Sequence, residues 1–154
     1  MKKDSVKIIA FGDLAIDSKR YLFKDDALDI IRQFTSNADI CLYNQEFPIT
    51  NSNDRTKLKS KYLCFKGHPQ SVNLAVRAGM NLACLANNHT FNYLEKGIDD
   101  TQEILSNRGI SVVGAGKTLN NALKPIEYKI NNMNLAIMNF AEKEYNCANQ
   151  NHGG

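Results

Sequence analysis

The stretch Met80–His89 reads Met-Asn-Leu-Ala-Cys-Leu-Ala-Asn-Asn-His, and the rest of the chain can be interpreted around it. Its apolar run, Leu82–Leu85, is typical of a buried strand and ends abruptly in the polar group Asn87-Asn88-His89. A short apolar run of this kind predicts a strand of a parallel sheet, and the carboxyl ends of such strands are where α/β proteins bind ligands. The amides and the imidazole at this position therefore predict a functional site.

The same pattern, an apolar run followed by a helical segment, recurs along the chain. Strands are predicted at Val6–Phe11, Ile40–Tyr43, Met80–Leu85 and Ile110–Val113. Apolar residues at helical spacing predict helices at Asp25–Phe34, Pro69–Ala78 and Glu95–Arg108. This alternation predicts an α/β fold with a mostly parallel sheet, flanking helices and right-handed crossovers.

The spacing also predicts which face of the first helix is buried and where the second helix ends. In the first helix, the spacing predicts that one apolar face is formed by Ala27, Ile30, Ile31 and Phe34. The second helix is expected to stop at Gly79, because glycine adopts the left-handed conformation of a helix terminus without steric cost.

The pattern changes after residue 125. The runs Ile126–Ile130 and Leu135–Phe140 lie on either side of Asn131-Asn132. Asparagine tolerates the positive φ that a tight turn requires. The segment therefore predicts an antiparallel C-terminal β-hairpin.

Composition limits the classes of function. The chain has 154 residues, of which 43% are hydrophobic and 23% charged, and a formal net charge of +3. These values fit a single domain over residues 1–154. The basic residues are scattered and tryptophan is absent, so no nucleic acid is expected as a partner. Four cysteines lie far apart without a CxxC pair, which argues against a thiolate zinc site.

The sequence contains no segment that resembles a signal peptide or a membrane span. The first apolar run, Ile8–Phe11, is far shorter than the hydrophobic region of a signal peptide. No other run approaches the length that crosses a bilayer. We therefore expect a cytoplasmic protein whose association with a membrane would depend on partner proteins.

Three predicted strands end in side chains that can bind metal or transfer protons: Asp13, Glu46, and Asn88 with His89. Parallel neighbouring strands would bring these groups to one edge of the sheet. Their oxygens suit Mg²⁺ or Mn²⁺, and with histidine also Zn²⁺ or Fe. A carboxylate can bridge two cations held ~3.5–4 Å apart, and such a pair activates water and holds a phosphoryl group. Taken alone, each residue is more often a turn, cap or surface residue, so the hypothesis depends on their convergence.

Several short motifs occur in a fixed order. They are Phe11-Gly12-Asp13, Asn44-Gln45-Glu46-Phe47-Pro48, Ala86-Asn87-Asn88-His89, Gly97 with Thr101, and Gly114-Ala115-Gly116 followed by Ala122 and Pro125. This set, from about Val6 to Phe140, resembles the CapA/PgsA family of bacterial capsule and poly-γ-glutamate synthesis proteins, a branch of the calcineurin-like metallophosphoesterases. The resemblance implies the N-terminal half of the four-layer αββα metallophosphoesterase fold.

The resemblance also implies roles for individual residues. Asp13, Glu46 and Asn88 would bind divalent metal ions, with Glu46 as the bridging carboxylate. His89 would be catalytic, and would hydrogen-bond or protonate the phosphate or the leaving group. Asn87 and Asn92 would contact the substrate, a phosphorylated or capsular-polymer-related compound.

This sequence departs from the family pattern in several places. Asn92 and Leu94 stand where the family usually has Asp and Gly. The family pattern continues with further histidine segments, which His68 and His152 do not match. We therefore expect a domain that is incomplete at its C-terminus. Its exposed sheet is expected to be covered by a second copy of the chain or by a partner protein.

Two functions follow from these observations. The first is a hydrolase of the phosphoesterase type in capsule or poly-γ-glutamate biosynthesis, dependent on Mn, Mg, Fe or Zn ions. The alternative is a non-catalytic accessory or interaction protein of capsular polymer assembly, which keeps the fold without a complete metal site. A nucleotide-binding domain is a weaker third interpretation, because the glycines at 12, 114 and 116 do not form GxGxxG after the first strand.

Overall fold

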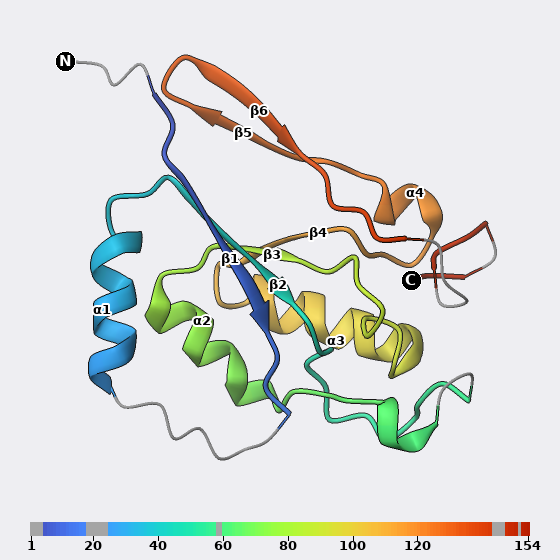
Figure 1. Cartoon of the computed structure of the whole chain (residues 1–154). Helices are drawn as coiled ribbons and strands as arrows, with labels where there is room; N and C mark the ends of the chain where they lie inside the picture. The colour runs from blue at the N-terminus through green and yellow to red at the C-terminus, as the bar shows by residue number, and fades with distance from the viewer. Residues whose placement is uncertain (1–4, 18–24, 58–59, 143–146, 151) are drawn as a thin grey trace.

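A central sheet of four parallel strands organises the molecule (Figure 1). The structure, a computed structural model, describes residues 5–17, 25–57, 60–142, 147–150 and 152–154. The strands lie side by side in chain order as β1 (Ile8–Leu14), β2 (Ile40–Gln45), β3 (Leu82–Cys84) and β4 (Ser111–Val113). They are connected through the helices α1 (Asp25–Thr35), α2 (Val72–Ala78) and α3 (Leu94–Ser106). The predicted α/β fold with a mostly parallel sheet is confirmed.

The chain after β4 forms a short helix and then a hairpin. The helix, α4 (Leu119–Ala122), is absent from the predicted elements and is capped by the Thr118 side chain. The strands β5 (Ile126–Ile130) and β6 (Met133–Ile137) pair antiparallel, and Asn131 takes a φ of 56° in the turn between them. The predicted hairpin is confirmed, with its second strand shifted toward the N-terminus.

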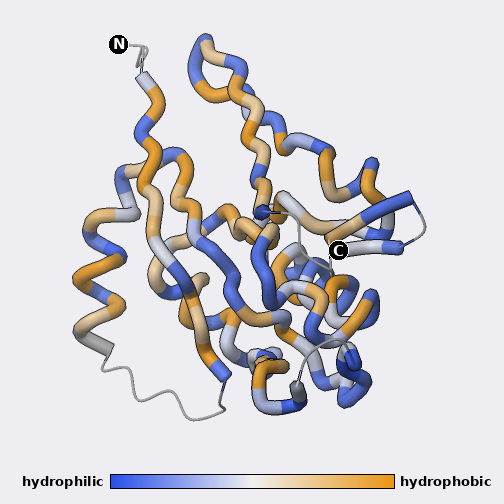
Figure 2. The backbone as a smooth tube through the Cα atoms, turned by 45° about the vertical axis from the view of Figure 1, so that its right-hand side comes forward, coloured by the Kyte–Doolittle hydropathy of each residue, from blue (hydrophilic) through white to orange (hydrophobic). Residues whose placement is uncertain are grey.

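Helices and hairpin cover opposite faces of the sheet (Figure 1). Side chains alternate along a strand, so Tyr43 and Ala83 pack on the helix side while Ile40 and Leu82 pack against the hairpin. Figure 2 shows that hydrophobic segments of the chain in the middle of the molecule give way along the chain to hydrophilic segments. The hairpin thus covers part of the sheet face that was expected to be exposed, although Ile8 of β1 remains 46% exposed.

The apolar face of α1 differs from the prediction. Leu28 is buried against α2, and Ile31 packs beside it. Ile30 and Phe34 are 56% and 66% exposed, and Ala27 is also exposed. Only one stripe of a surface helix can face its neighbour. Spacing alone does not reveal which of two adjacent apolar stripes faces α2.

Short helical turns flank the second helix. Lys61–Leu63 and Pro69–Ser71 form single 3₁₀ turns, and the His68 side chain caps the second one. Helix α2 ends at Gly79, whose φ of 77° confirms the predicted left-handed stop. All helices in the described ranges fall short of the length and apolar character needed to cross a membrane.

Candidate functional site

An irregularity in strand pairing places Asp13 beside β2. Residues 8–10 pair in one register with β2, and the register then shifts so that Asp13 pairs with Asn44. Bulges of this kind re-aim side chains and are common next to functional sites. Asp13 therefore lies within β1, rather than directly after it as predicted, and faces the polar end of β2.

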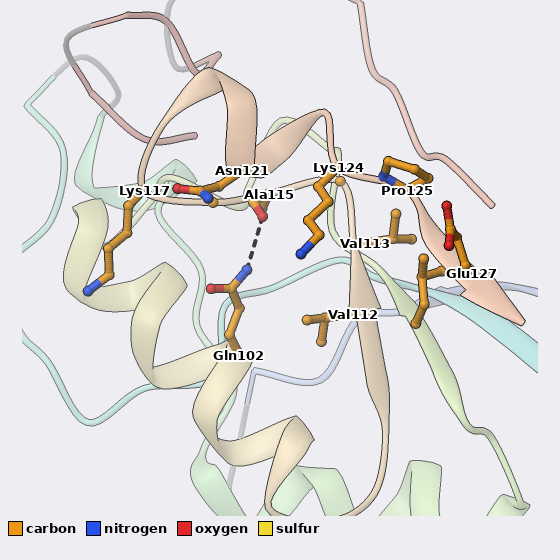
Figure 3. A pocket seen from close by; sticks show the side chains of 12 residues that line it. Gln102, Val112, Val113, Ala115, Lys117, Asn121, Lys124, Pro125 and Glu127 are labelled. Carbon is orange, nitrogen blue, oxygen red and sulfur yellow. Dashed lines mark hydrogen bonds between the residues drawn. The ribbon is translucent and has the colours of Figure 1, made fainter. Parts of the chain in front are cut away.

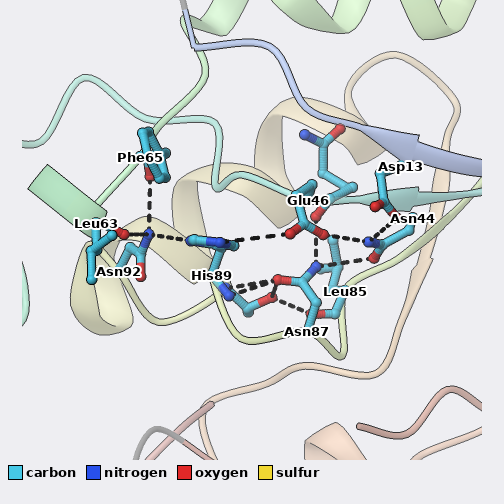
Figure 4. Close-up of polar contacts among 11 residues, drawn as sticks. Asp13, Asn44, Glu46, Leu63, Phe65, Leu85, Asn87, His89 and Asn92 are labelled. Carbon is cyan, nitrogen blue, oxygen red and sulfur yellow. Dashed lines mark hydrogen bonds and ion pairs between the residues drawn. The ribbon is translucent and has the colours of Figure 1, made fainter. Parts of the chain in front are cut away.

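Asn44 joins the two carboxylates of the site (Figure 4). Its Nδ2 donates to Asp13 Oδ1 at 2.8 Å and to Glu46 Oε2 at 2.6 Å. Asp13 is exposed and Glu46 is half-buried. Two anionic groups therefore converge on a single amide nitrogen at the surface end of two neighbouring strands.

Asn87 organises the turn after β3. Its Oδ1 accepts the backbone N–H groups of His89 at 2.9 Å and Thr90 at 3.1 Å. Its Nδ2 donates to Asn44 Oδ1 at 3.0 Å and to the Gln45 carbonyl at 2.9 Å. Both ends of this amide are engaged inside the protein, so Asn87 links the turn to β2. Contact between Asn87 and a substrate stays a prediction.

The His89 ring lies between a carboxylate and an amide (Figure 4). Its Nε2 is 3.6 Å from Glu46 Oε1, and its Nδ1 is 2.9 Å from Asn92 Nδ2. The rings of Phe47 and Phe65 meet it edge-on, with centroids 5.3 and 5.5 Å away. These contacts hold the imidazole with its Nε2 toward Glu46.

Asn92 and Asn88 occupy opposite environments. Asn92 has no exposed surface, and its side-chain amide contacts the His89 ring and two backbone carbonyls. Asn88 is exposed and lines a hollow of about 360 Å³ between the turn after β3 and the segment 139–142. Direct contact between Asn92 and a substrate would require this buried side chain to become accessible.

A larger hollow of about 820 Å³ lies where β4, α4 and β5 meet (Figure 3). Gln102 Nε2 donates to the Ala115 carbonyl at 3.0 Å beside it. Its charged lining residues, Lys117, Lys124 and Glu127, are of both signs. The hollow shares no lining residue with the group formed by the carboxylates and the imidazole, and is therefore separate from the site.

The interior behind the site is apolar. Burial raises the pKa of the Tyr43 phenol far above its ordinary value, and the neighbouring Cys84 thiol raises it further. Burial also raises the pKa of Cys84 itself. Both groups therefore stay protonated near neutral pH.

The structure brings three of the predicted side chains, Asp13, Glu46 and His89, to neighbouring strand ends. Sequence reasoning missed Asn44, although its position two residues before Glu46 predicts that both side chains point to the same side at the end of β2. It also missed Phe65, which reaches the His89 ring from a distant loop and has no local signal in the sequence. Over the described ranges, no three or more His, Cys, Asp or Glu side chains form a group that could hold a metal ion.

Fold and site together define an α/β protein with a carboxylate–amide–imidazole group at the carboxyl ends of parallel strands. A family model described as bacterial capsule synthesis protein PGA_cap matches residues 7–154. The chain belongs to this family, which confirms the resemblance to the CapA/PgsA proteins.

Individual relatives match smaller parts of the chain. A probable polyglutamine synthesis accessory protein of Mycobacterium tuberculosis is 35% identical over 81 residues, or 53% of this chain and 21% of the relative. The PGA biosynthesis protein CapA of Bacillus subtilis is 28% identical over 106 residues, which are 68% of this chain and 28% of the relative. The capsule biosynthesis protein CapA of Bacillus anthracis is 24% identical over 113 residues, which are 73% of this chain and 28% of the relative. The chain thus matches less than a third of the length of each relative.

Proposed function

We propose that this chain acts in the biosynthesis of a bacterial capsular or poly-γ-glutamate polymer and carries a metal-dependent hydrolase site of the phosphoesterase type. The family match over residues 7–154 supports the biological role. The observation that carries the chemical part is the convergence of Asp13, Glu46 and His89 at three strand ends. The substrate would be a phosphorylated or polymer-related compound.

Asp13 and Glu46 are the proposed ligands of a divalent cation, with the exposed Asn88 as a third candidate ligand. The two carboxylates accept hydrogen bonds from the same nitrogen, Asn44 Nδ2, and carboxylate oxygens are typical ligands of divalent cations. Mg²⁺ and Mn²⁺ use oxygen donors, and Mg²⁺ in particular binds through one or two carboxylates and keeps several waters. The described residues offer no group of three His, Cys, Asp or Glu ligands, so the proposed cation is Mg²⁺ or Mn²⁺ rather than Zn²⁺ or Fe.

The surrounding side chains support a role in phosphoryl chemistry. A bound cation would supply charge neutralisation for phosphoryl oxygens. His89 turns its Nε2 toward the same carboxylate, so it can hydrogen-bond or protonate an oxygen held there. Asn44 and Asn87 join the ends of β1, β2 and β3, and so hold these groups in a fixed geometry.

Calorimetric titration with Mn²⁺ and Mg²⁺ tests the metal site. We expect a binding heat in the unmodified chain that is lost in Asp13→Asn and in Glu46→Gln. Glu103→Gln, which changes an exposed carboxylate on α3, is the matched control and should bind as the unmodified chain does. Binding that is indifferent to Asp13 and Glu46 would exclude this site.

The accessory alternative is favoured by a different observation. Apolar side chains are strongly exposed, among them Phe34 at 66% and Phe140 at 62%. Exposed apolar surface is typical of proteins that bind other proteins, and a second copy of the chain or another protein of polymer assembly would cover it.

Turnover separates the two functions. Hydrolysis of a chromogenic phosphodiester by the purified chain, lost in His89→Ala, supports the enzyme. Metal binding without turnover supports the accessory role. Sedimentation analysis of the same sample then shows whether the chain associates with itself.

A further inference from the structure

The orientation of the Asn92 amide follows from its surroundings (Figure 4). Its Nδ2 faces His89 Nδ1 at 2.9 Å and the carbonyl oxygens of Leu63 and Phe65 at 3.4 Å each. A backbone carbonyl oxygen can only accept a hydrogen bond. The reversed amide would place Oδ1 against two carbonyl oxygens, so the NH₂ end must face this side.

The opposite end of the Asn92 amide is buried as well. Asn92 has no exposed surface, and its Oδ1 has no hydrogen-bond partner within the described residues. A buried acceptor without a donor is unfavourable. The amide nevertheless keeps its NH₂ group toward the ring and the two carbonyls, where it has three acceptors.

The direction of this hydrogen bond decides the tautomer of the ring. An amide N–H can bond only to a ring nitrogen that carries a lone pair, so Nδ1 of His89 accepts. The neutral imidazole then carries its proton on Nε2, the nitrogen that faces Glu46. The edges of Phe47 and Phe65 restrict rotation of the ring.

We infer that Asn92 is a positioning residue that fixes neutral His89 as the Nε2–H tautomer, so that the ring presents an N–H donor at the site. The consequence for chemistry rests on the proposed function. A ring in this state can donate to an oxygen of a phosphorylated substrate, whereas its Nε2 has no lone pair to offer to a cation.

Two other histidines provide internal references for a test. His68 Nδ1 accepts from the Gln70 N–H at 3.2 Å, so His68 is also the Nε2–H tautomer. His152 Nδ1 lies 2.6 Å from the Gly153 carbonyl oxygen, which requires a proton on Nδ1. The same molecule therefore contains one example of each tautomer.

Long-range ¹H–¹⁵N NMR of the full ¹⁵N-labelled chain, without metal, reads the tautomer of each neutral imidazole. His89→Gln assigns the His89 signals by their loss. We expect His89 to show the pattern of His68, with Nδ1 in the downfield range of an unprotonated nitrogen. A His89 pattern that matches His152 would overturn the inference.

Variants of residue 92 test whether Asn92 sets this state. Asn92→Asp replaces the donor by an acceptor, and should move the His89 proton to Nδ1. Asn92→Ala should give a mixture of tautomers, whereas Asn134→Asp, at an exposed position of β6, should change nothing. An unchanged His89 pattern in folded Asn92→Ala would contradict the role of Asn92.

Failure of the variants to fold does not remove the test, because the unmodified chain alone decides the tautomer. The measurement needs neither metal nor turnover. A chain with the Nε2–H tautomer and no Mn²⁺ binding keeps this inference and loses the proposed metal site. A chain that binds Mn²⁺ and shows the Nδ1–H tautomer keeps the proposed metal site and loses this inference.

Discussion

At the residue scale, two adjacent asparagines have different tasks. Asn87 makes hydrogen bonds to Asn44, to the Gln45 carbonyl and to the N–H groups of the turn, whereas Asn88 is exposed. The first is therefore required by the fold, whereas the second lies at the surface. Identical residue types in consecutive positions make this a well-matched comparison.

Asn87→Ala should lower the free energy of unfolding by about 2 kcal/mol, because it leaves partly buried backbone groups without partners. Asn88→Ala should change that free energy by less than about 0.5 kcal/mol, as is usual for surface substitutions. Urea denaturation followed by circular dichroism measures both values. Equal effects of the two substitutions would contradict the roles assigned here.

For Tyr43, we expect a substitution to raise the free energy of unfolding rather than lower it. Its side chain has no exposed surface, and within the described part of the chain its hydroxyl has no hydrogen-bond partner. Removing an unsatisfied buried hydroxyl relieves its desolvation penalty. Tyr43→Phe should therefore raise the free energy of unfolding by about 1 kcal/mol, while Tyr62→Phe, at an exposed position, leaves it unchanged. A loss of stability in Tyr43→Phe would show that the hydroxyl has a partner.

At the element scale, the start of α3 is strained. Leu94, its first residue, has a φ of 58°, a left-handed conformation that disfavours side chains with a Cβ. The sequence marks the position, because the family pattern usually has glycine there. The turn that carries His89 leads directly into this residue, so the strain lies next to the candidate site.

Leu94→Gly should raise the free energy of unfolding by about 0.5–1 kcal/mol, because glycine adopts this φ without steric cost. Leu119, the first residue of α4, is also half-buried and is not among the residues with positive φ. Leu119→Gly should therefore lower that free energy. Thermal unfolding of both variants measures the difference, and a matching loss in both would argue against strain at Leu94.

Some features of the elements could be predicted from the sequence and others could not. The strand at Leu82–Leu85 was predictable because a buried parallel strand is a continuous apolar run with polar ends. The bulge that brings Asp13 beside Asn44 could not be predicted, because the pairing register depends on both strands. Phe65 reaches the His89 ring through tertiary packing, which leaves no trace in the local sequence.

At the scale of the whole molecule, Asp100 ties α3 to the segment after β2. Burial raises the pKa of Asp100, but hydrogen bonds from Lys96 and Thr50 and the charge of Lys96 outweigh burial and hold that pKa below its ordinary value. A lowered carboxyl pKa stabilises the folded state above the unfolded pKa. This stabilisation is lost as the pH falls through the folded value.

Asp100→Asn should lower the free energy of unfolding by about 1 kcal/mol at neutral pH. The difference from the unmodified chain should shrink below about pH 4. Asp99→Asn is the control, since the ion pair of Asp99 with Lys117 is largely exposed and such pairs contribute little. Denaturant titrations across this pH range measure the effect, and a difference that is constant with pH would contradict it.

The order of the central strands has a consequence for how the molecule is built during synthesis. Each of the four strands lies beside the one made just before it. A growing chain can therefore add each strand to an edge that already exists, and no strand has to insert between two others. Chains fold from the N-terminus as they leave the ribosome. The β1–β2 pair that holds Asp13 and Glu46 together can thus form before the turn that carries His89 has been translated.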